Sequence, residues 1–395
     1  MTSALKRVHV PTPRSQWTSG TIYGLDDRLL DGRILDRSLS AWRQQQGIEP
    51  LTTATLEGPL LVVGDDIWIS DRMIRDFVRT ARNVSDAEPV RLVRDADGPG
   101  QFADPLGRLP RIPQAKGIAF DVWYLGPACT VEWPTGSPLP DALEKAVGVD
   151  VKTDTFELEV PVDPEASGGL SQRTFAVAPV AAAPISHWAE LHRANLLALG
   201  TNALEAGPVW GVLALIWAVF RAMSINPYHV LAKLTRRGRG CRIHPKAVVE
   251  GCTLGDGVEV DAGAVLRGCV VGDGAKIGAN AIAEFSVIGA GVHLTRLAMA
   301  NLCVLYPNAR IGGILQLAMA GEGATTKMVS IGLDMGLDKP VRVLTPDGLK
   351  AIDIGYQGIC IGHRAFVASG VWIAPGRIVA PRRRLLRAPE TIIRI

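Results

Sequence analysis

The sequence has no closely spaced cysteine pair, no long apolar run and no strong net charge. Its six cysteines include no CxxC pair, so buried, reduced thiols are expected. The most apolar run, 208–223, has sixteen residues, whereas a helix that spans a bilayer needs about 20. The net charge of +3 makes no case for nucleic acid as a partner. The first fifteen residues lack the apolar stretch of a signal peptide, which predicts a cytoplasmic protein.

A fixed period of seventeen residues runs from Cys241 to Gly312. Steps of six, five and six residues separate aliphatic positions within each period. One column holds aliphatic residues, namely Ile243, Val260, Ile277, Leu294 and Ile311, and another holds Cys252, Cys269, Ser286 and Cys303. Short strands joined by tight, glycine-containing corners, three to a coil, account for this spacing. An all-β parallel β-helix is therefore predicted over 241–395.

This repeat resembles the hexapeptide repeats of acyltransferases and of the C-terminal domains of sugar-nucleotide pyrophosphorylases. The resemblance implies a left-handed β-helix and a homotrimer; the spacing alone does not give the hand. A prism with flat faces also leaves an apolar face for a neighbour, which agrees with a closed trimer. In those acyltransferases a histidine is the general base, and acetyl-CoA lies along a groove between two subunits.

Three histidines of the repeat region are candidates for such a base: His244, His293 and His363. The period is lost after Gly312, so a loop interruption is expected at 313–350, with the repeat returning at Ile354. His363 is the predicted catalytic residue because it follows this interruption and has Arg364 beside it. The competing interpretation is a corner histidine that faces solvent. A zinc site like that of γ-carbonic anhydrases is not predicted, because that family's closely spaced histidine pair is missing.

The N-terminal part, 1–184, has the pattern of an α/β domain with a mainly parallel sheet. A continuous apolar run at 59–64 predicts a buried strand, and Ser70 is the predicted N-cap of the helix that follows it. Further helices are predicted at 34–46 and Leu139–Val147, and further strands at Val90–Val93, Ile118–Leu125 and Phe156–Val162.

Two segments of this part resemble sugar-phosphate nucleotidyltransferases. Asp31–Gly47 is similar to the segment that follows their catalytic loop, although the Pro of their Gly-Lys-Pro turn is missing. Gly58–Ile69 (GPLLVVGDDIWI) is similar to their strand ending in Gly-Asp. The resemblance implies that Asp65 takes the position that holds the metal ion, Mg²⁺, on the nucleotide phosphates. It also implies a nucleotide sugar or sugar phosphate as ligand.

The same family opens with a loop of the form GxGTRxxP, whose backbone N–H groups and Arg hold the triphosphate. No segment before Asp31 has that form. We therefore expect a degenerate domain that does not catalyse nucleotidyl transfer.

The segment 163–184 has the Pro, Gly and Ser content of a linker, and 185–240 is predicted to be a helical linker between the two domains. Within it, an apolar stretch precedes a basic cluster at 233–239. Burial in the protein or between subunits is favoured, because no face of this stretch is polar. The alternative is association of 208–240 with an anionic membrane surface.

The layout resembles that of bifunctional N-acetylglucosamine-1-phosphate uridyltransferases. The sequence thus predicts a transferase-like protein of sugar-nucleotide or cell-envelope metabolism. The alternative is a non-catalytic trimeric scaffold or regulatory subunit, since this β-helix carries many functions.

Overall fold

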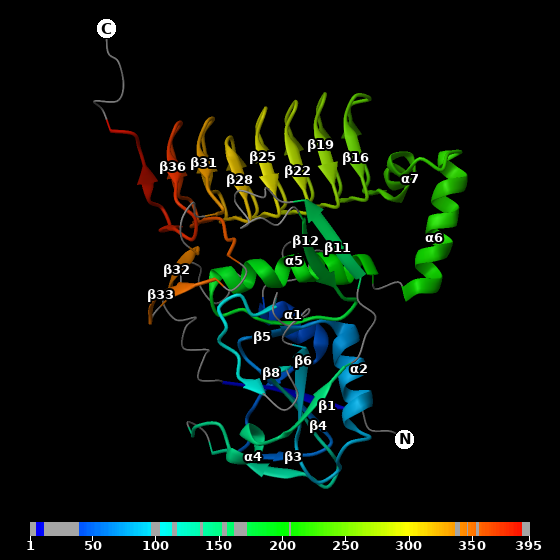
Figure 1. The fold of residues 1–395 in the computed structure, drawn as a ribbon, viewed down its shortest axis with the longest axis vertical. Coiled ribbons are helices and arrows are strands. Elements are labelled where there is room, and N and C mark those ends of the chain that lie inside the picture. The colour runs from blue at the N-terminus through cyan, green and yellow to red at the C-terminus, as the bar shows by residue number, and fades with distance from the viewer. Residues whose placement is uncertain are drawn as a thin grey trace. The chain divides into compact units, whose positions relative to one another are not determined.

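The computed structural model describes residues 5–11, 39–95, 103–112, 117–134, 137–151, 156–161, 172–204, 207–335, 340–345, 347–352 and 355–388. These residues form two compact units, which divide between Thr201 and Asn202. The predicted boundary at 184 falls earlier, because the helix that follows it packs within the first unit. Figure 1 shows the elements of both units.

The first unit contains a sheet in the order β10-β6-β8-β4-β1-β2, with β7 beside β8. The strands are β1 Lys6–Val10, β2 Glu49–Pro50, β4 Leu60–Gly64, β6 Val90–Asp95, β7 Arg111–Ile112, β8 Gly117–Leu125 and β10 Val147–Asp150. β4 pairs in parallel with β1, and β10 with β6. β8 runs antiparallel to both β4 and β6, so the sheet is mixed where a mainly parallel one was expected. Strand pattern alone does not show direction, because a strand buried on both faces reads alike in either direction.

The helix predicted from Ser70 is confirmed as α2, Asp71–Ala81. The Ser70 side chain accepts a hydrogen bond from the N–H of Met73, and the apolar face of α2 is buried: Met73, Ile74, Phe77, Val78 and Ala81. Further helices of the unit, among the described residues, are α1 Leu39–Gln46, α4 Asp141–Glu144 and α5 Trp188–Leu204. α4 is shorter than the helix predicted at Leu139–Val147, because β10 begins at Val147.

The linker expected at 163–184 contains strands. β12, Gln172–Val177, pairs with β11, Phe156–Pro161, and β13, Ala182–Pro184, pairs with β5, Ile67–Ile69. A third small pair joins β3, Thr55–Glu57, to β9, Thr130–Glu132. A segment rich in Pro, Gly and Ser can therefore also contain short strands.

The second unit contains the predicted parallel β-helix, built from three parallel sheets. One sheet comprises β14 Arg236–Arg237, β17 Thr253–Leu254, β20 Val270–Val271, β23 Val287–Ile288, β26 Val304–Leu305, β29 Met319–Ala320, β34 Cys360–Ile361 and β37 Ile378–Val379. The second comprises β15 Arg242–Ile243, β18 Glu259–Val260, β21 Lys276–Ile277, β24 His293–Leu294, β27 Arg310–Ile311, β30 Thr325–Thr326, β35 Phe366–Val367 and β38 Arg384–Leu385. The third comprises β16 Val248–Glu250, β19 Val265–Arg267, β22 Ile282–Glu284, β25 Met299–Asn301, β28 Ile314–Gln316, β31 Ile331–Gly332 and β36 Trp372–Ile373.

The repeat columns are the core of this unit. Val260, Ile277, Leu294 and Ile311 pair across successive coils and are 3% exposed or less. The β-helix begins earlier than expected, with β14, Arg236–Arg237. The sequence does not reveal this strand, because its two arginines at the open end of the β-helix do not match the aliphatic pattern.

The β-helix also continues further than expected, through β28, β29, β30 and β31, within the predicted interruption. Met299 pairs with Ile314, a step of fifteen residues instead of seventeen. The shortened corner lies at Gly312-Gly313, where a side chain on Gly313 would meet the carbonyl oxygen of Ser330 at 2.0 Å. Two missing residues break a fixed period while leaving the coil intact. The insertion proper lies between β31 and β34 and contains the hairpin of β32, Arg342–Thr345, and β33, Gly348–Ala351. Ile354 lies outside the described residues.

Two helices precede the coils: α6, Gly207–Ala222, and α7, Pro227–Leu234. Asn226 caps α7 by accepting from the N–H of Tyr228, as the Asn-Pro sequence predicts. Among the described residues, no helix is both long and apolar enough to cross a membrane.

Candidate functional site

Asp65 lies at the carboxyl ends of β1 and β4, where the sequence places it. Val10 is opposite Gly64 in the parallel pair, and the N–H of Asp65 donates to the carbonyl of Val10 at 2.8 Å. The guanidinium of Arg43, from α1, donates to the carbonyl oxygen of Asp65. Ligands of open α/β sheets bind at such an edge. The metal-binding role of Asp65 stays a prediction.

The described surroundings of Asp65 bear on its predicted role as a magnesium ligand. At phosphate sites Mg²⁺ is usually held by one or two carboxylates together with substrate phosphates and waters. In the parts of the chain that the structure describes, no group of three or more His, Cys, Asp or Glu could hold a metal ion. Arg43 also places a positive charge beside Asp65, which opposes a second cation there.

His9, on β1, is held in its neutral form at the same edge. Burial, with the positive charge of Arg43 as the smaller cause, lowers the pKa of His9 to about 4. Beside Asp65, the described part of this edge therefore presents a neutral imidazole and the guanidinium of Arg43, neither of which exchanges protons near pH 7.

A buried ionic cluster that no sequence motif predicts lies at the start of α5. Arg108 Nη1 donates to both carboxylate oxygens of Glu190, at 2.8 and 3.0 Å, and to Ser186 Oγ at 2.6 Å. Glu190 Oε2 also accepts from the backbone N–H groups of Ser186 and His187. A carboxylate in the first turn of a helix is stabilised by the free N–H groups there. Arg108 and Glu190 are 82 residues apart, so no local sequence pattern records their pair.

Glu190 has a pKa raised to about 7, mainly because its side chain is wholly buried. Arg108 opposes this rise in the pKa, whereas the charges of Asp104 and Asp66 add to it. Such a carboxyl can take up or release a proton near neutral pH. Because solvent does not reach it, we assign it a role in stability.

A shallow groove of about 440 Å³ lies along α2 near the start of β1. Four of the side chains that line it are basic, namely Arg7, Arg75, Arg79 and Arg82. Two of these are engaged, since Arg7 donates to the carbonyl of Gln46 and Arg79 to Asp76. The groove lies at the end of β1 opposite to Asp65.

His363 lies at a corner of the β-helix just after the inserted hairpin. Its Nδ1 accepts from the N–H of Glu322 at 2.8 Å, and its ring meets the edge of Tyr306 with 5.6 Å between centroids. A neutral histidine that accepts at Nδ1 carries its proton on Nε2. The Nδ1 lone pair of His363 is therefore occupied by the N–H of Glu322. To act as a general base, His363 would first have to break this hydrogen bond, so its catalytic role stays a prediction.

The other histidines and the cysteines give no catalytic constellation among the described residues. His244 Nδ1 accepts from the N–H of Lys246, and burial together with nearby cations lowers the pKa of His293. The six cysteines are free, and all but Cys241 are buried. Burial raises the pKa of Cys303 to about 12, so this thiol is not a nucleophile at neutral pH.

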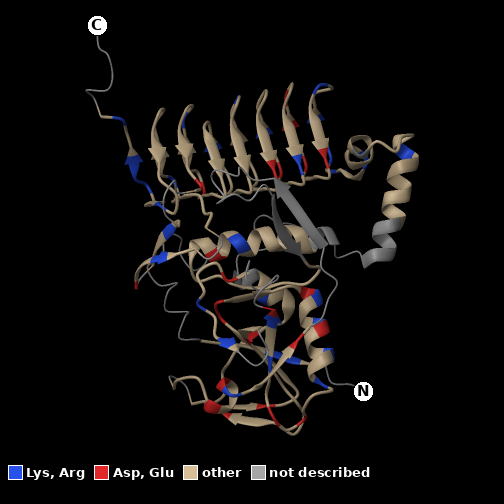
Figure 2. Cartoon of the chain, viewed as in Figure 1, with Lys and Arg blue, Asp and Glu red and all other residues tan. Residues whose placement is uncertain are grey.

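The sheet that starts with β16 has an apolar column on its outer surface. Inward residues of this sheet, such as Leu266 and Ala283, are fully buried, so their neighbours along each strand point outward. The outer column pairs coil to coil as Val248, Val265, Ile282, Met299, Ile314, Ile331 and Trp372. None of these is buried, and Trp372 is 66% exposed. We call this set the apolar ladder. In Figure 2, β25, β28 and β31 carry no charged residue.

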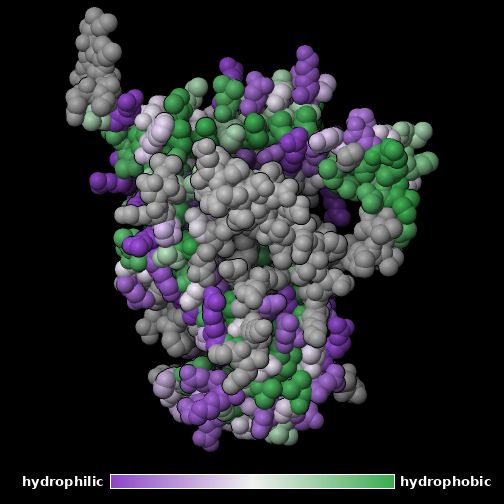
Figure 3. All heavy atoms as spheres, in the orientation of Figure 1, coloured by the Kyte–Doolittle hydropathy of each residue, from purple (hydrophilic) through white to green (hydrophobic). Residues whose placement is uncertain are grey.

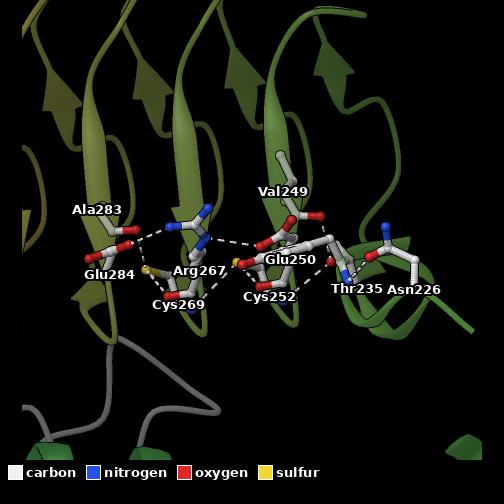
Figure 4. A network of polar contacts seen from close by, with 10 residues as sticks. Asn226, Thr235, Val249, Glu250, Cys252, Arg267, Cys269, Ala283 and Glu284 are labelled. Carbon is white, nitrogen blue, oxygen red and sulfur yellow. Dashed lines mark hydrogen bonds and ion pairs between the residues drawn. The ribbon is translucent and has the colours of Figure 1, made fainter. Parts of the chain in front are cut away.

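A second outward column of the same sheet is polar. Arg267 Nε donates to Glu250 Oε2 at 2.9 Å, and its Nη1 donates to Glu284 Oε1 at 3.0 Å (Figure 4). These charges satisfy one another within the chain. The sheet that starts with β15 differs, because its outer column is mostly charged: Arg242, Glu259, Lys276, His293, Arg310, Thr325, Phe366 and Arg384.

No protein-family model matches this chain, and no curated protein matches it.

Proposed function

We propose that this chain is a hexapeptide-repeat protein of sugar-nucleotide or cell-envelope metabolism that works as a homotrimeric scaffold. The observation that carries this proposal is the apolar ladder. Seven apolar side chains follow one another along one outer face, whereas the equivalent column of the β15 sheet is mostly charged. A contiguous exposed apolar stripe of this kind marks a surface that is covered by another protein surface.

A second copy of the chain is the occupant that we propose for the ladder. Covering one half-exposed aliphatic side chain stabilises an assembly by about 1 kcal/mol, so a ladder of them supports a stable interface. The flanking charges of Glu250, Arg267 and Glu284 already have partners, so the ladder can be covered without leaving a charge unpaired. A cyclic arrangement closes without open ends, and the number three rests on the resemblance to hexapeptide proteins.

The first unit would then carry a ligand-binding function without nucleotidyl transfer. Support comes from the missing phosphate loop and from Arg43, whose guanidinium donates to the carbonyl oxygen of Asp65 and adds positive charge there. A nucleotide sugar or sugar phosphate is the ligand class that the resemblance implies.

The proposal is tested by placing a charge in the middle of the ladder. We expect Ile282→Glu to dissociate the assembly in analytical ultracentrifugation, because a buried carboxylate at the interface has no partner. His293→Glu is the matched control: it lies on the charged face between Lys276 and Arg310, and we expect it to leave the assembly intact. Equal behaviour of the two variants would refute the ladder as the interface.

A second candidate function, acyl transfer, is favoured by the place of His363 at the corner after β34, the first strand of the β-helix beyond the insertion. The resemblance implies acetyl-CoA as cofactor and an amino sugar as acceptor. Acetyl-CoA turnover with amino-sugar acceptors that is lost in His363→Ala would support catalysis, and its absence would leave the scaffold function.

A further inference from the structure

The helical hairpin of α6 and α7 exposes an unusual amount of apolar surface. Among the residues whose side chains are described, only Ala218 of α6 and Val230 of α7 are buried. The most exposed part is the turn between the helices, which we call the α6–α7 tip, Phe220 to Tyr228. There Phe220 is 66% exposed, Met223 85% and Ile225 91%. Figure 3 shows apolar side chains gathered over this hairpin. Such a surface requires a cover.

The charge around the tip has one sign. From Gly207 to Val249 the sequence has no Asp or Glu and seven Lys and Arg. Two of these, Arg239 and Arg242, pair with Asp256 and Glu259 of the next coil. The remaining five are exposed and have no ion pair within the described residues: Arg221, Lys233, Arg236, Arg237 and Lys246. A binding partner for this surface must therefore present both apolar and anionic groups.

We infer that the α6–α7 tip docks on the surface of an anionic lipid bilayer. The apolar tip enters the boundary between headgroups and acyl chains, and the cations meet the lipid phosphates. Aromatic residues suit this depth, and the tip region has Tyr228 and the stacked pair Trp217 and Phe220 at 5.8 Å between centroids. A sixteen-residue helix, about 24 Å long, matches one leaflet with its headgroups better than a whole bilayer.

The hairpin is fixed to the β-helix, so docking would orient the coils on the membrane. The carbonyl of Leu231 accepts from the N–H of Gly251, and the Thr235 hydroxyl donates to the carbonyl of Val249. Both contacts join α7 to the first coils. The α6–α7 tip contains none of the residues of the apolar ladder, so the inference goes beyond the proposed assembly.

The first test is sedimentation of the full chain with vesicles. We expect binding to vesicles of phosphatidylcholine with 30% phosphatidylglycerol, and binding at least about tenfold weaker to pure phosphatidylcholine, because each basic residue near an anionic surface adds to the affinity. Raising the salt from 50 to 500 mM weakens the binding as charges are screened. No binding to either vesicle, or equal binding to both, would overturn the inference.

Variants separate the tip from other apolar surface. We expect Phe220→Ser with Ile225→Ser to abolish binding, whereas Leu344→Ser with Leu349→Ser, two exposed leucines of the inserted hairpin, retains it. We expect Arg236→Gln with Arg237→Gln to weaken binding about tenfold. The matched control is Arg382→Gln with Arg383→Gln, an exposed pair at the far end of the coils, which binds as the parent does.

The alternative is that a neighbouring subunit covers the α6–α7 tip. The mass of the assembly in solution distinguishes the two cases. If Phe220→Ser with Ile225→Ser lowered the mass of the assembly in solution, the tip would lie between subunits, and the inference would be wrong. An unchanged mass together with lost vesicle binding supports docking on lipid.

Discussion

Arg267 and Glu250 face each other on neighbouring coils, 2.9 Å apart between Nε and Oε2. The Glu250 carboxylate is 9% exposed, and Arg267 reaches in the other direction to Glu284. The hydrogen bond to Glu250 is the largest cause of the raised pKa of Arg267. One guanidinium thus ties three coils together on the outer surface.

Replacing this guanidinium should destabilise the β-helix. We expect Arg267→Met to lower the free energy of unfolding by about 1–2 kcal/mol, since the nearly buried Glu250 loses its partner. Arg242→Met is the control, because its pair with Glu259 is largely exposed and screened by solvent, so its loss should change stability much less. Urea unfolding measures both, and equal losses would contradict the role of Arg267.

The shortened corner should depend on glycine at 313. A methyl group there would lie 2.0 Å from the carbonyl oxygen of Ser330, so we expect Gly313→Ala to cost several kcal/mol or to prevent folding. Gly257 has φ +68° and nothing within 4 Å, so Gly257→Ala should cost about 1 kcal/mol from backbone strain alone. A Gly313→Ala protein as stable as Gly257→Ala would show that the corner is placed wrongly.

Much of the β-helix could be predicted because its core is a set of columns with one spacing. The sequence could not show that the coils pass through Gly313, since two missing residues shift every later column at once. Arg236 was missed as a coil strand because the first coil exposes a charged residue where later coils bury an aliphatic one. The apolar ladder is hard to recognise in the sequence for a different reason. Its aliphatic residues are each next in sequence to a residue of the core column, which is equally aliphatic, so the pattern does not show which column faces outward.

In the first unit, local signals were sufficient for α2 and for the place of Asp65. The antiparallel direction of β8 and the pair Arg108–Glu190 depend on contacts between distant segments. No pattern within one segment records those contacts.

The buried carboxyl of Glu190 should make stability depend on pH. Its pKa is about 7 in the folded chain against 4.5 for a free glutamate, so the folded state holds a proton that the unfolded state has released. This contribution is fully present below pH 4.5 and is lost as pH rises to about 7, an effect on the order of 3 kcal/mol. We expect Glu190→Gln to flatten the fall in Tm between pH 5 and pH 8. A fall as steep as that of the parent chain would count against this assignment.

Nucleotidyl transfer should be absent. Without a phosphate loop, and with Arg43 beside Asp65, we expect no pyrophosphate exchange with any common sugar 1-phosphate in the presence of Mg²⁺. The assay is run on the parent chain and on Asp65→Ala. Exchange by the parent that disappears in Asp65→Ala would restore the catalytic interpretation of the first unit.

Light scattering of the purified chain in buffer without detergent tests the central claim, self-association through the apolar ladder, most directly. One chain has a mass of 42.2 kDa. The account predicts a single species of about three times that mass, independent of salt because the ladder is apolar. A species at 42.2 kDa at micromolar concentration would contradict it.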